Sequence, residues 1–322
     1  MTEISPTNAA DVLAAIPAGL GIVPTDSIIA VLLSPNAAPG ESLKAVGFLN
    51  FQKDLTAMLA LKIIPASGLL LQRIGSVILT AIWDGPVTDY DRARLASLEA
   101  GFARHGIPVI RTLHAQTLTE PAQWADLDTG ESGPTYPHQE SLHTARARAA
   151  GQPIAETKDA ARAEFAEVDP PAPMIAMGDP MTMLLEASEE LAQVLSSHRT
   201  PSDHLATLLG VLVCHSDRAF QALLSFGVDE PQRAAAVWTV VATRLRSEAR
   251  TWALISAAIF HYLAGQGVRS GTALDVAADE CVEAGLPTPR LVDELRLGVK
   301  AAVTPAEARE HILFLLDELG RV

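Results

Sequence analysis

The sequence has few cysteines, few aromatic residues and few basic residues, and each shortage excludes a class of protein. Two cysteines, Cys214 and Cys281, in 322 residues exclude a disulfide scaffold. Aromatic residues make up only 5% of the chain, and an aromatic residue at helical spacing more often belongs to a core than to a binding groove. Lys and Arg number 24 against 38 Asp and Glu, and the resulting net charge of −14 repels phosphate backbones and anionic lipid. We therefore expect no nucleic-acid partner and no membrane partner.

Long apolar runs and secretion signals are also missing. The longest apolar run, Trp252–Gly265, is shorter than the roughly 20 residues that a membrane-spanning helix needs. The N-terminus carries Glu3 and no basic stretch ahead of an apolar one, so no secretory signal is predicted. These observations predict a cytoplasmic protein.

The motifs of common nucleotide and hydrolase sites do not occur. Gly19-Leu-Gly21 precedes a predicted strand instead of opening a helix, which favours a tight turn with positive φ over a dinucleotide site. Gly130-Glu-Ser-Gly133 lacks the strand-to-helix context that exposes a nucleophile. We accordingly predict no bound cofactor.

Apolar residues are plentiful, at 48% of a chain long enough for two domains. In the first part, runs of strand length predict strands over Ile28–Leu33, Leu43–Phe51, Ser76–Trp83 and Ile107–Leu113. Helices are expected over Ala9–Ile16, in the region after Asp54, and ahead of Gly106, where Thr88 and Asp91 have the spacing of a capping box. A short Pro/Gly loop makes the first two strands a predicted antiparallel hairpin, and two strand-helix-strand crossovers follow. The fold class predicted here is an α/β domain with a mixed sheet.

Residues 1–168 are expected to form this α/β domain with a loop and a helical extension, and residues 174–322 an all-helical domain. The composition of Asp126–Pro137 predicts a loop, and the prolines of Asp169–Pro173 predict the linker between the domains. Beyond the linker every segment has helical period: Met181–Ser197, His204–Phe226, Pro231–Leu263 (long enough for two helices), Thr272–Ala284, Leu291–Ala301 and Pro305–Leu319. Short glycine breaks favour a bundle or a tetratricopeptide-like stack, although no repeat of about 34 residues is found.

Several short motifs resemble one protein family. Residues 16–31 contain leucine-glycine, proline and aspartate-serine followed by an apolar strand, and Trp83-Asp84 and Ser216-Asp217-Arg218 match as well. The chain is similar to an actinobacterial and phage family known only as a conserved domain of unknown function. This resemblance implies a shared fold and brings no activity. Many relatives carry a cysteine-rich, metal-binding type of stretch after the fourth strand, but the corresponding loop here has no cysteine.

Asp84 and Asp26 are the candidate ligand-binding or catalytic residues. In open α/β sheets ligands gather at the carboxyl ends of parallel strands, and Asp84 directly follows the third predicted strand. The alternative for Asp84 is a turn-forming aspartate before Gly85. Asp26 begins its strand, so we expect it at the opposite end of the sheet, where it could instead cap backbone donors together with Ser27.

His138, Glu140 and His143 are the densest group of metal-binding side-chain types. Zinc needs several such ligands converging at about 2 Å. On a helix only Glu140 and His143 share a face, so all three converge only if His138 lies in the preceding loop. The alternative is an exposed polar segment.

Two sets of arginines could bind an anion or could pair with carboxylates on solvated helix faces. The sets are Arg146, Arg148 and Arg162, and Arg244, Arg246 and Arg250. The aromatic residues of the helical part, Trp238, Trp252, Phe260 and Tyr262, are typical of a core but could line a partner site on a curved helical stack.

The absence of a complete catalytic constellation favours a non-catalytic interaction or assembly protein. Its helical domain would bind a protein partner or a second copy of the chain. The alternative is an enzyme or small-molecule-binding protein with its site at the carboxyl edge of the sheet near Asp84, an interpretation that rests on architecture alone.

Overall fold

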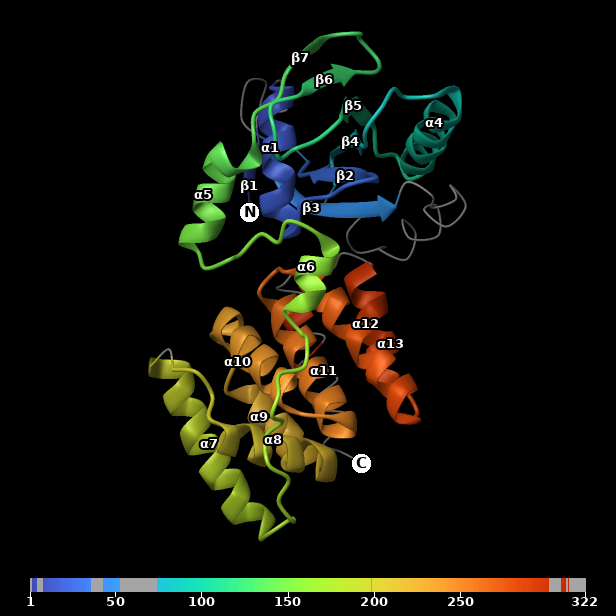
Figure 1. Cartoon of the computed structure of the whole chain (residues 1–322). Coiled ribbons are helices and arrows are strands. Elements are labelled where there is room, and N and C mark those ends of the chain that lie inside the picture. The colour runs from blue at the N-terminus through green and yellow to red at the C-terminus, as the bar shows by residue number, and fades with distance from the viewer. Residues whose placement is uncertain are drawn as a thin grey trace. The chain divides into compact units, whose positions relative to one another are not determined.

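A computed structural model describes residues 2–4, 8–35, 43–52, 74–197, 199–300, 308–310 and 312. Its contacts divide the chain into two units, one up to Lys158 and one from Asp159 to Val299 (Figure 1). The first unit contains the sheet, and the second is helical. In the part of the chain described, no helix is long and apolar enough to cross a membrane.

The first unit is built on a seven-stranded mixed sheet with the strand order β1-β3-β2-β4-β5-β6-β7. Its strands are β1 (Thr2–Ile4), β2 (Ser27–Leu33), β3 (Leu43–Gln52), β4 (Ser76–Ile82), β5 (Val109–Ala115), β6 (Gln123–Asp126) and β7 (Ser132–Pro134). β2 pairs antiparallel with both β3 and β4, and β4 pairs parallel with β5. The predicted hairpin and mixed sheet are confirmed.

The crossover between β4 and β5 is the helix α4 (Asp89–Ala103). It begins with the predicted capping box, in which Thr88 Oγ1 accepts the Asp91 N–H and the Asp91 carboxylate accepts the Thr88 N–H. β3 and β4 run in the same direction with β2 between them, as a first crossover requires. The helix expected after Asp54 falls in residues 53–73, outside the described residues.

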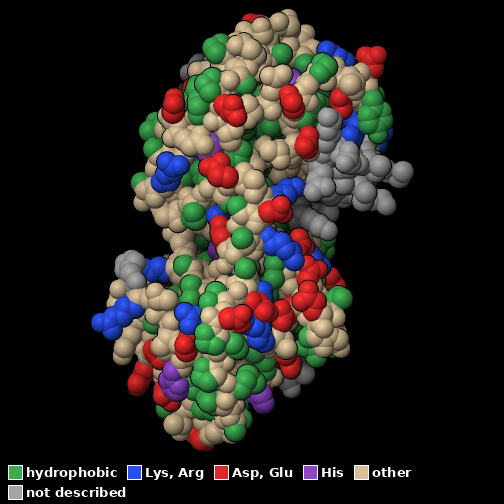
Figure 2. Space-filling view, viewed as in Figure 1, with side chains coloured by type: hydrophobic (Ala, Val, Ile, Leu, Met, Phe, Trp, Pro, Cys, Tyr) green, Lys and Arg blue, Asp and Glu red, His purple; other side chains and the backbone are tan. Residues whose placement is uncertain are grey.

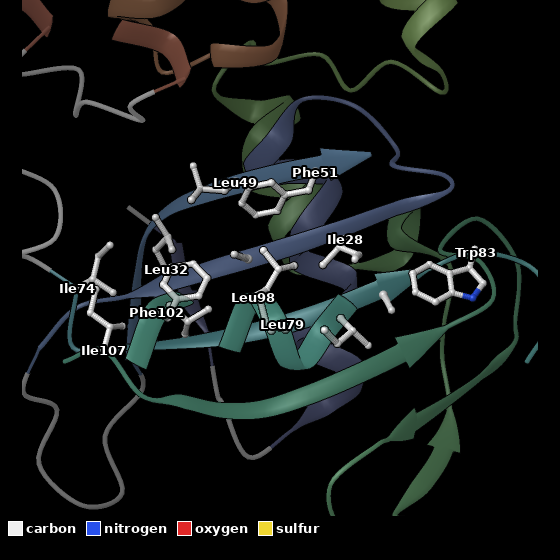
Figure 3. Close-up of a cluster of buried hydrophobic side chains, with 14 residues drawn as sticks. Ile28, Leu32, Leu49, Phe51, Ile74, Leu79, Trp83, Leu98, Phe102 and Ile107 are labelled. Atoms are coloured by element: carbon white, nitrogen blue, oxygen red, sulfur yellow. The ribbon is translucent and has the colours of Figure 1, made fainter. Parts of the chain in front are cut away.

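The core of the first unit lies on both faces of β2, and all seven residues of this strand are buried. Alternate residues point to opposite faces of a strand, so Ile28 and Leu32 face one layer and Ile29 the other. Figure 3 shows α4 in front of the sheet, with Leu98 and Phe102 over Leu32 and Leu79, and α1 behind it. A strand covered on both faces is what the continuous apolar run of β2 predicts.

The first helix, α1 (Ala9–Leu20), does not end at Pro17 as expected. A proline within a helix removes one backbone hydrogen-bond donor. α1 nevertheless continues beyond Pro17 to Leu20. The helix ends instead at Gly21, whose φ of 76° is the left-handed conformation predicted for this glycine pair. Gly19 lies inside the helix, where an added Cβ would be only 2.1 Å from Cε2 of Phe48.

The segment Asp126–Pro137, expected to be a loop, contributes to a β6–β7 hairpin. Asp126 closes its turn, because Oδ1 accepts the N–H groups of Asp128 and Thr129, both at 3.0 Å. Oδ2 accepts Nε–H of Arg111 on β5 at 2.7 Å. A buried aspartate bonded to a distant arginine therefore fixes a hairpin that composition alone presents as irregular.

Among the described residues, three short helices follow the sheet, and seven longer ones come after them in the second unit. The short ones are the 3-10 helix η1 (His138–Glu140), α5 (Leu142–Ala149) and α6 (Lys158–Ala163). The longer ones are α7 (Pro180–Ser197), α8 (Asp203–His215), α9 (Asp217–Ser225), α10 (Pro231–Arg244), α11 (Ser247–Leu263), α12 (Gly267–Ala284) and α13 (Arg290–Lys300). α11 packs against α8, α10 and α12.

The helical periods predict these helices well, with two errors of boundary. The run His204–Phe226 is two helices, because Ser216 leaves the helical conformation and its hydroxyl caps α9 by accepting the Ala219 N–H. α12 begins at Gly267, ahead of the expected start at Thr272, and continues through Gly271. Most of the expected helix 305–319 lies outside the described residues.

Candidate functional site

Asp26 and Asp84 lie at the same end of the sheet. β2 runs antiparallel to β4 and Ser27 pairs with Ile82, so the residue before β2 lies at the end where β4 finishes. The expectation of opposite ends is wrong, because it holds only for neighbouring strands of the same direction. The predicted hairpin and crossover already imply this arrangement, because the second strand runs opposite to the first and a crossover makes the third run with the second.

Both carboxylates are exposed, and both lie in tight backbone turns. Asp84 Oδ1 accepts the N–H of Gly85 at 2.9 Å, the bond of a turn-forming aspartate. Asp26 has a φ of 44°, a left-handed conformation that aspartate adopts more readily than most residues. The Trp83 side chain, which precedes Asp84, is buried beside the His114 ring, with centroids 5.5 Å apart. This end of the sheet thus offers two solvated carboxylates.

His138, Glu140 and His143 do not form the metal site considered above. His138 is buried, Glu140 is exposed and His143 is half-buried, so the three side chains do not converge. Among the described residues, no group of three or more His, Cys, Asp or Glu side chains could hold a metal ion. Burial lowers the pKa of both histidines.

The segment that carries these histidines makes a polar contact with α1. Tyr136 Oη donates to Asp11 Oδ1 at 2.5 Å, and burial together with this carboxylate raises the tyrosine pKa. Ser141 caps α5 by accepting the Thr144 N–H and donates from its hydroxyl to the Ala14 carbonyl on α1. No spacing in the sequence signals this contact, because its partners are more than a hundred residues apart.

Three arginines of the second unit hold one stretch of chain, residues 164–169, which we call the acidic segment. Arg269 binds Glu164 with two parallel hydrogen bonds of 2.8 and 2.6 Å. Arg250 reaches Glu167 at 2.9 Å and also donates to the Phe165 carbonyl at 2.8 Å. The acidic segment ends at the first residue of the linker expected at Asp169–Pro173, and it is bound to arginines of α11 and α12.

Three further arginines of the two predicted sets also form ion pairs with carboxylates. Arg246 contacts Glu167 and Asp169, Arg244 contacts Asp203, and Arg162 contacts Asp279. These pairs favour the carboxylate-paired interpretation over an anion site.

Phe165 anchors the acidic segment in the helical core. Its side chain is fully buried and meets the His261 ring edge-on, with centroids 5.8 Å apart. His261 lies between Gln266 and Thr239, at 2.7 and 3.0 Å. Burial lowers the pKa of His261 to about 4, against the opposing effect of the Gln266 hydrogen bond, so the ring is neutral at pH 7.

The aromatic residues considered for a partner site are core residues or partly buried. Trp238, Phe260 and Tyr262 are buried, and Trp252 packs against Phe220 with centroids 5.2 Å apart. They do not form an exposed aromatic surface.

Exposed apolar side chains gather instead at the start of α7. Four of the six methionines lie between Met174 and Met183. Met181 and Leu185, one helical turn apart, are 64% and 58% exposed, and Met174 and Ile175 just before the helix are 85% and 40% exposed. We call these four residues the Met-rich surface. The inner face of α7 is already buried through Met183, Ala187 and Leu191, so the helix is apolar on two sides.

An acidic hollow of about 460 Å³ lies along the following turns of α7. Its lining residues are Glu186, Glu189, Glu190, Gln193, Val194, Arg199, Thr200 and Ser202. Glu186 pairs with His204 at 2.8 Å, and Glu190 accepts from the Ser202 hydroxyl at 2.6 Å. In the lower part of Figure 2, hydrophobic and acidic side chains reach the surface of the helical unit next to one another.

The comparison with protein families gives one match that spans most of the chain. The model described as a domain of unknown function (DUF4192) matches residues 10–305. Comparisons with the curated proteins and with the solved structures give no match.

Proposed function

The chain belongs to the DUF4192 family, whose description assigns no activity, and from its own surface we propose a non-catalytic protein-interaction protein that acts through its helical unit. The observation that carries this proposal is the Met-rich surface. Singly exposed apolar residues are ordinary, but Met181 and Leu185 are exposed together on one face of α7, and neighbouring exposed apolar side chains mark interaction sites. Methionine side chains are flexible and polarisable, and they suit surfaces that adapt to a partner.

The position of the Met-rich surface on α7 supports the same function. A helix at the edge of a bundle needs one apolar stripe, and α7 meets that need with its buried face. Met181 and Leu185 form a second stripe that contributes nothing to that buried face. Full burial of a side chain of this kind stabilises by roughly 1.5–3 kcal/mol. Met181 and Leu185 lack much of this stabilisation because they are exposed, and a bound partner would supply it.

Other features of the chain support a soluble binding role. The net charge of −14 disfavours a nucleic-acid partner. The packing of α11 against α8, α10 and α12 supports a bundle in preference to a tetratricopeptide-like stack, in which each helix pair contacts only its neighbours.

A second candidate function is a small-molecule-binding protein or enzyme with its site near Asp84. The pairing of β2 with β4 favours it, because it brings Asp26 to the same end of the sheet. A thermal-shift screen of nucleotides and divalent metals tests this candidate, since a ligand at about 100 times its dissociation constant stabilises by roughly 2.7 kcal/mol. If Asp84→Asn leaves every detected ligand bound and every activity intact, the candidate fails.

Site-specific crosslinking in the native host tests the interaction function. A photoreactive residue replaces Met181 in one variant and Val282, an exposed apolar residue of α12, in a matched control. We expect an adduct of discrete mass at position 181 and none at 282, and Leu185→Glu should remove the adduct. A chain that stays monomeric and gives no adduct at 181, or equal adducts at both positions, would contradict the proposal.

A further inference from the structure

The structure also indicates which kind of partner the helical unit binds. We propose that the Met-rich surface and the acidic hollow together accept a basic amphipathic helix from another protein. This inference rests on the proposed function, because it names the partner of the same surface. It is carried by the order of apolar and acidic side chains along α7 and by the charge of the hollow.

Apolar and acidic residues follow one another along a single exposed stripe of α7. Met181, Leu185 and Glu189 are spaced by four residues and therefore share a face of the helix. Glu186 and Glu190 form the adjacent stripe, one turn apart, and both line the hollow. A partner helix lying along α7 would place apolar residues on the first turns and cationic residues on the later ones.

The electrostatics of the hollow favour a cationic partner. Among its lining residues, three glutamates face one arginine, Arg199. The bonds to His204 and Ser202 each engage one carboxylate oxygen of Glu186 and of Glu190, so the second oxygens can accept from a Lys or Arg of a partner. A hollow with an excess of negative charge, in a chain of net charge −14, raises the local concentration of cations.

The same charges disfavour a second copy of this chain as the partner. In a two-fold symmetric dimer the same patch meets itself. Two acidic hollows would then face each other across the interface, and juxtaposed like charges disfavour association. A different protein with positive charge avoids this repulsion, so charge complementarity selects a heterologous partner.

The dimensions of the surface fit a helix in a groove-like contact. From Met181 to Gln193 the helix extends roughly 18 Å at 1.5 Å per residue. A partner helix of three to four turns covers this length, with apolar anchors at i, i+3 and i+4 at one end.

Binding of designed peptides to the whole chain tests the inference. The probe is an 18-residue helix whose contact face carries Leu along one half of its length and Lys along the other half, and its control is the same peptide with Glu in place of Lys. Fluorescence anisotropy at low and at physiological salt gives the dissociation constants. We expect the Lys peptide to bind at least tenfold more tightly than the Glu peptide, with a difference that shrinks as salt rises.

Two variants separate the apolar from the acidic contribution. The triple variant Glu186→Gln, Glu189→Gln, Glu190→Gln should weaken the Lys peptide about tenfold, as expected for three solvent-exposed ion pairs. A charge-matched control, Asp89→Asn, Glu99→Gln, Glu120→Gln in the first unit, should change the affinity less than twofold. The double variant Met181→Ser, Leu185→Ser should abolish specific binding.

Each other outcome has a defined meaning. If both peptides bind equally and only the serine variant reduces binding, the basic partner is wrong and the Met-rich surface remains a binding site. If the Lys peptide binds without dependence on Met181 and Leu185, the attraction is non-specific and the inference fails. Absence of binding below 1 mM also overturns the inference, while an adduct at position 181 would still uphold the proposed function.

Discussion

The acidic segment determines where a stable helical fragment must begin. A fragment from Asp159 retains Glu164, Phe165 and Glu167, whereas a fragment from Met174, at the start of the predicted all-helical domain, loses all three. Removing the fully buried Phe165 side chain corresponds to a large-to-small core substitution, which costs about 3–5 kcal/mol. The buried guanidinium of Arg269 additionally loses its two bonds to Glu164.

The electrostatic part is of similar size. Removing one partner of a buried ion pair costs about 3–5 kcal/mol, and the lower end applies because Glu164 is 34% exposed. The two losses together reach roughly 6–8 kcal/mol, which is comparable to the total stability of about 5–15 kcal/mol of a typical domain. We therefore expect the fragment from Met174 to be largely unfolded at 25 °C.

Urea denaturation followed by far-ultraviolet circular dichroism measures the difference. The fragment from Asp159 should unfold cooperatively, and the fragment from Met174 should show no native baseline. In the full chain, Phe165→Ala should lower the free energy of unfolding of the helical unit by about 3–5 kcal/mol. Equal urea midpoints for the two fragments would refute the reasoning, because the acidic segment would then contribute nothing to the fold.

Three further predictions follow from single residues. The folded pKa of His261, about 4, lies below its unfolded value of about 6.5, so stability is complete above pH 6.5 and falls by about 3 kcal/mol toward pH 4, and His261→Gln should flatten this pH profile of urea midpoints. Gly227→Ala should lower the melting temperature, at a cost of about 1–3 kcal/mol, because its Cβ would lie 2.6 Å from the Phe260 ring, whereas Gly267→Ala meets nothing within 4 Å and should not destabilise. Asp126→Asn should cost the first unit about 2 kcal/mol at pH 7 in urea titrations and less at pH 3, because its lowered pKa means that acid removes the same stabilisation; an equal loss at both pH values would contradict this.

Much of the fold could be predicted because local patterns determine it. The continuous apolar run of β2 indicated a strand covered on both faces, and Thr88 with Asp91 indicated the start of α4. The β6–β7 hairpin could not be predicted, because Asp126 depends on Arg111 on another strand. Local propensity carries no information about such a bond.

The candidate sites, too, could be predicted from the sequence only where local patterns determine them. The methionines near α7 are visible in the sequence, but their exposure depends on which face of the helix the bundle buries. The relative positions of Asp26 and Asp84 depend on strand direction, which the pairing of β2 with β4 determines. His138 and Glu140 have side chains of metal-binding types, but His138 is buried and Glu140 is exposed to solvent. The sequence does not show this difference in burial.

The burial of α11 has a consequence for how the helical unit opens. Of its 17 residues 13 are buried, so its amides can exchange with solvent only when α8, α10 and α12 separate from it. Hydrogen exchange in α11 should therefore report global unfolding, while α7, which packs mainly on α8, should exchange through local opening. The proposed binding surface thus lies on a helix that can detach or readjust while the cooperative centre of the unit stays folded.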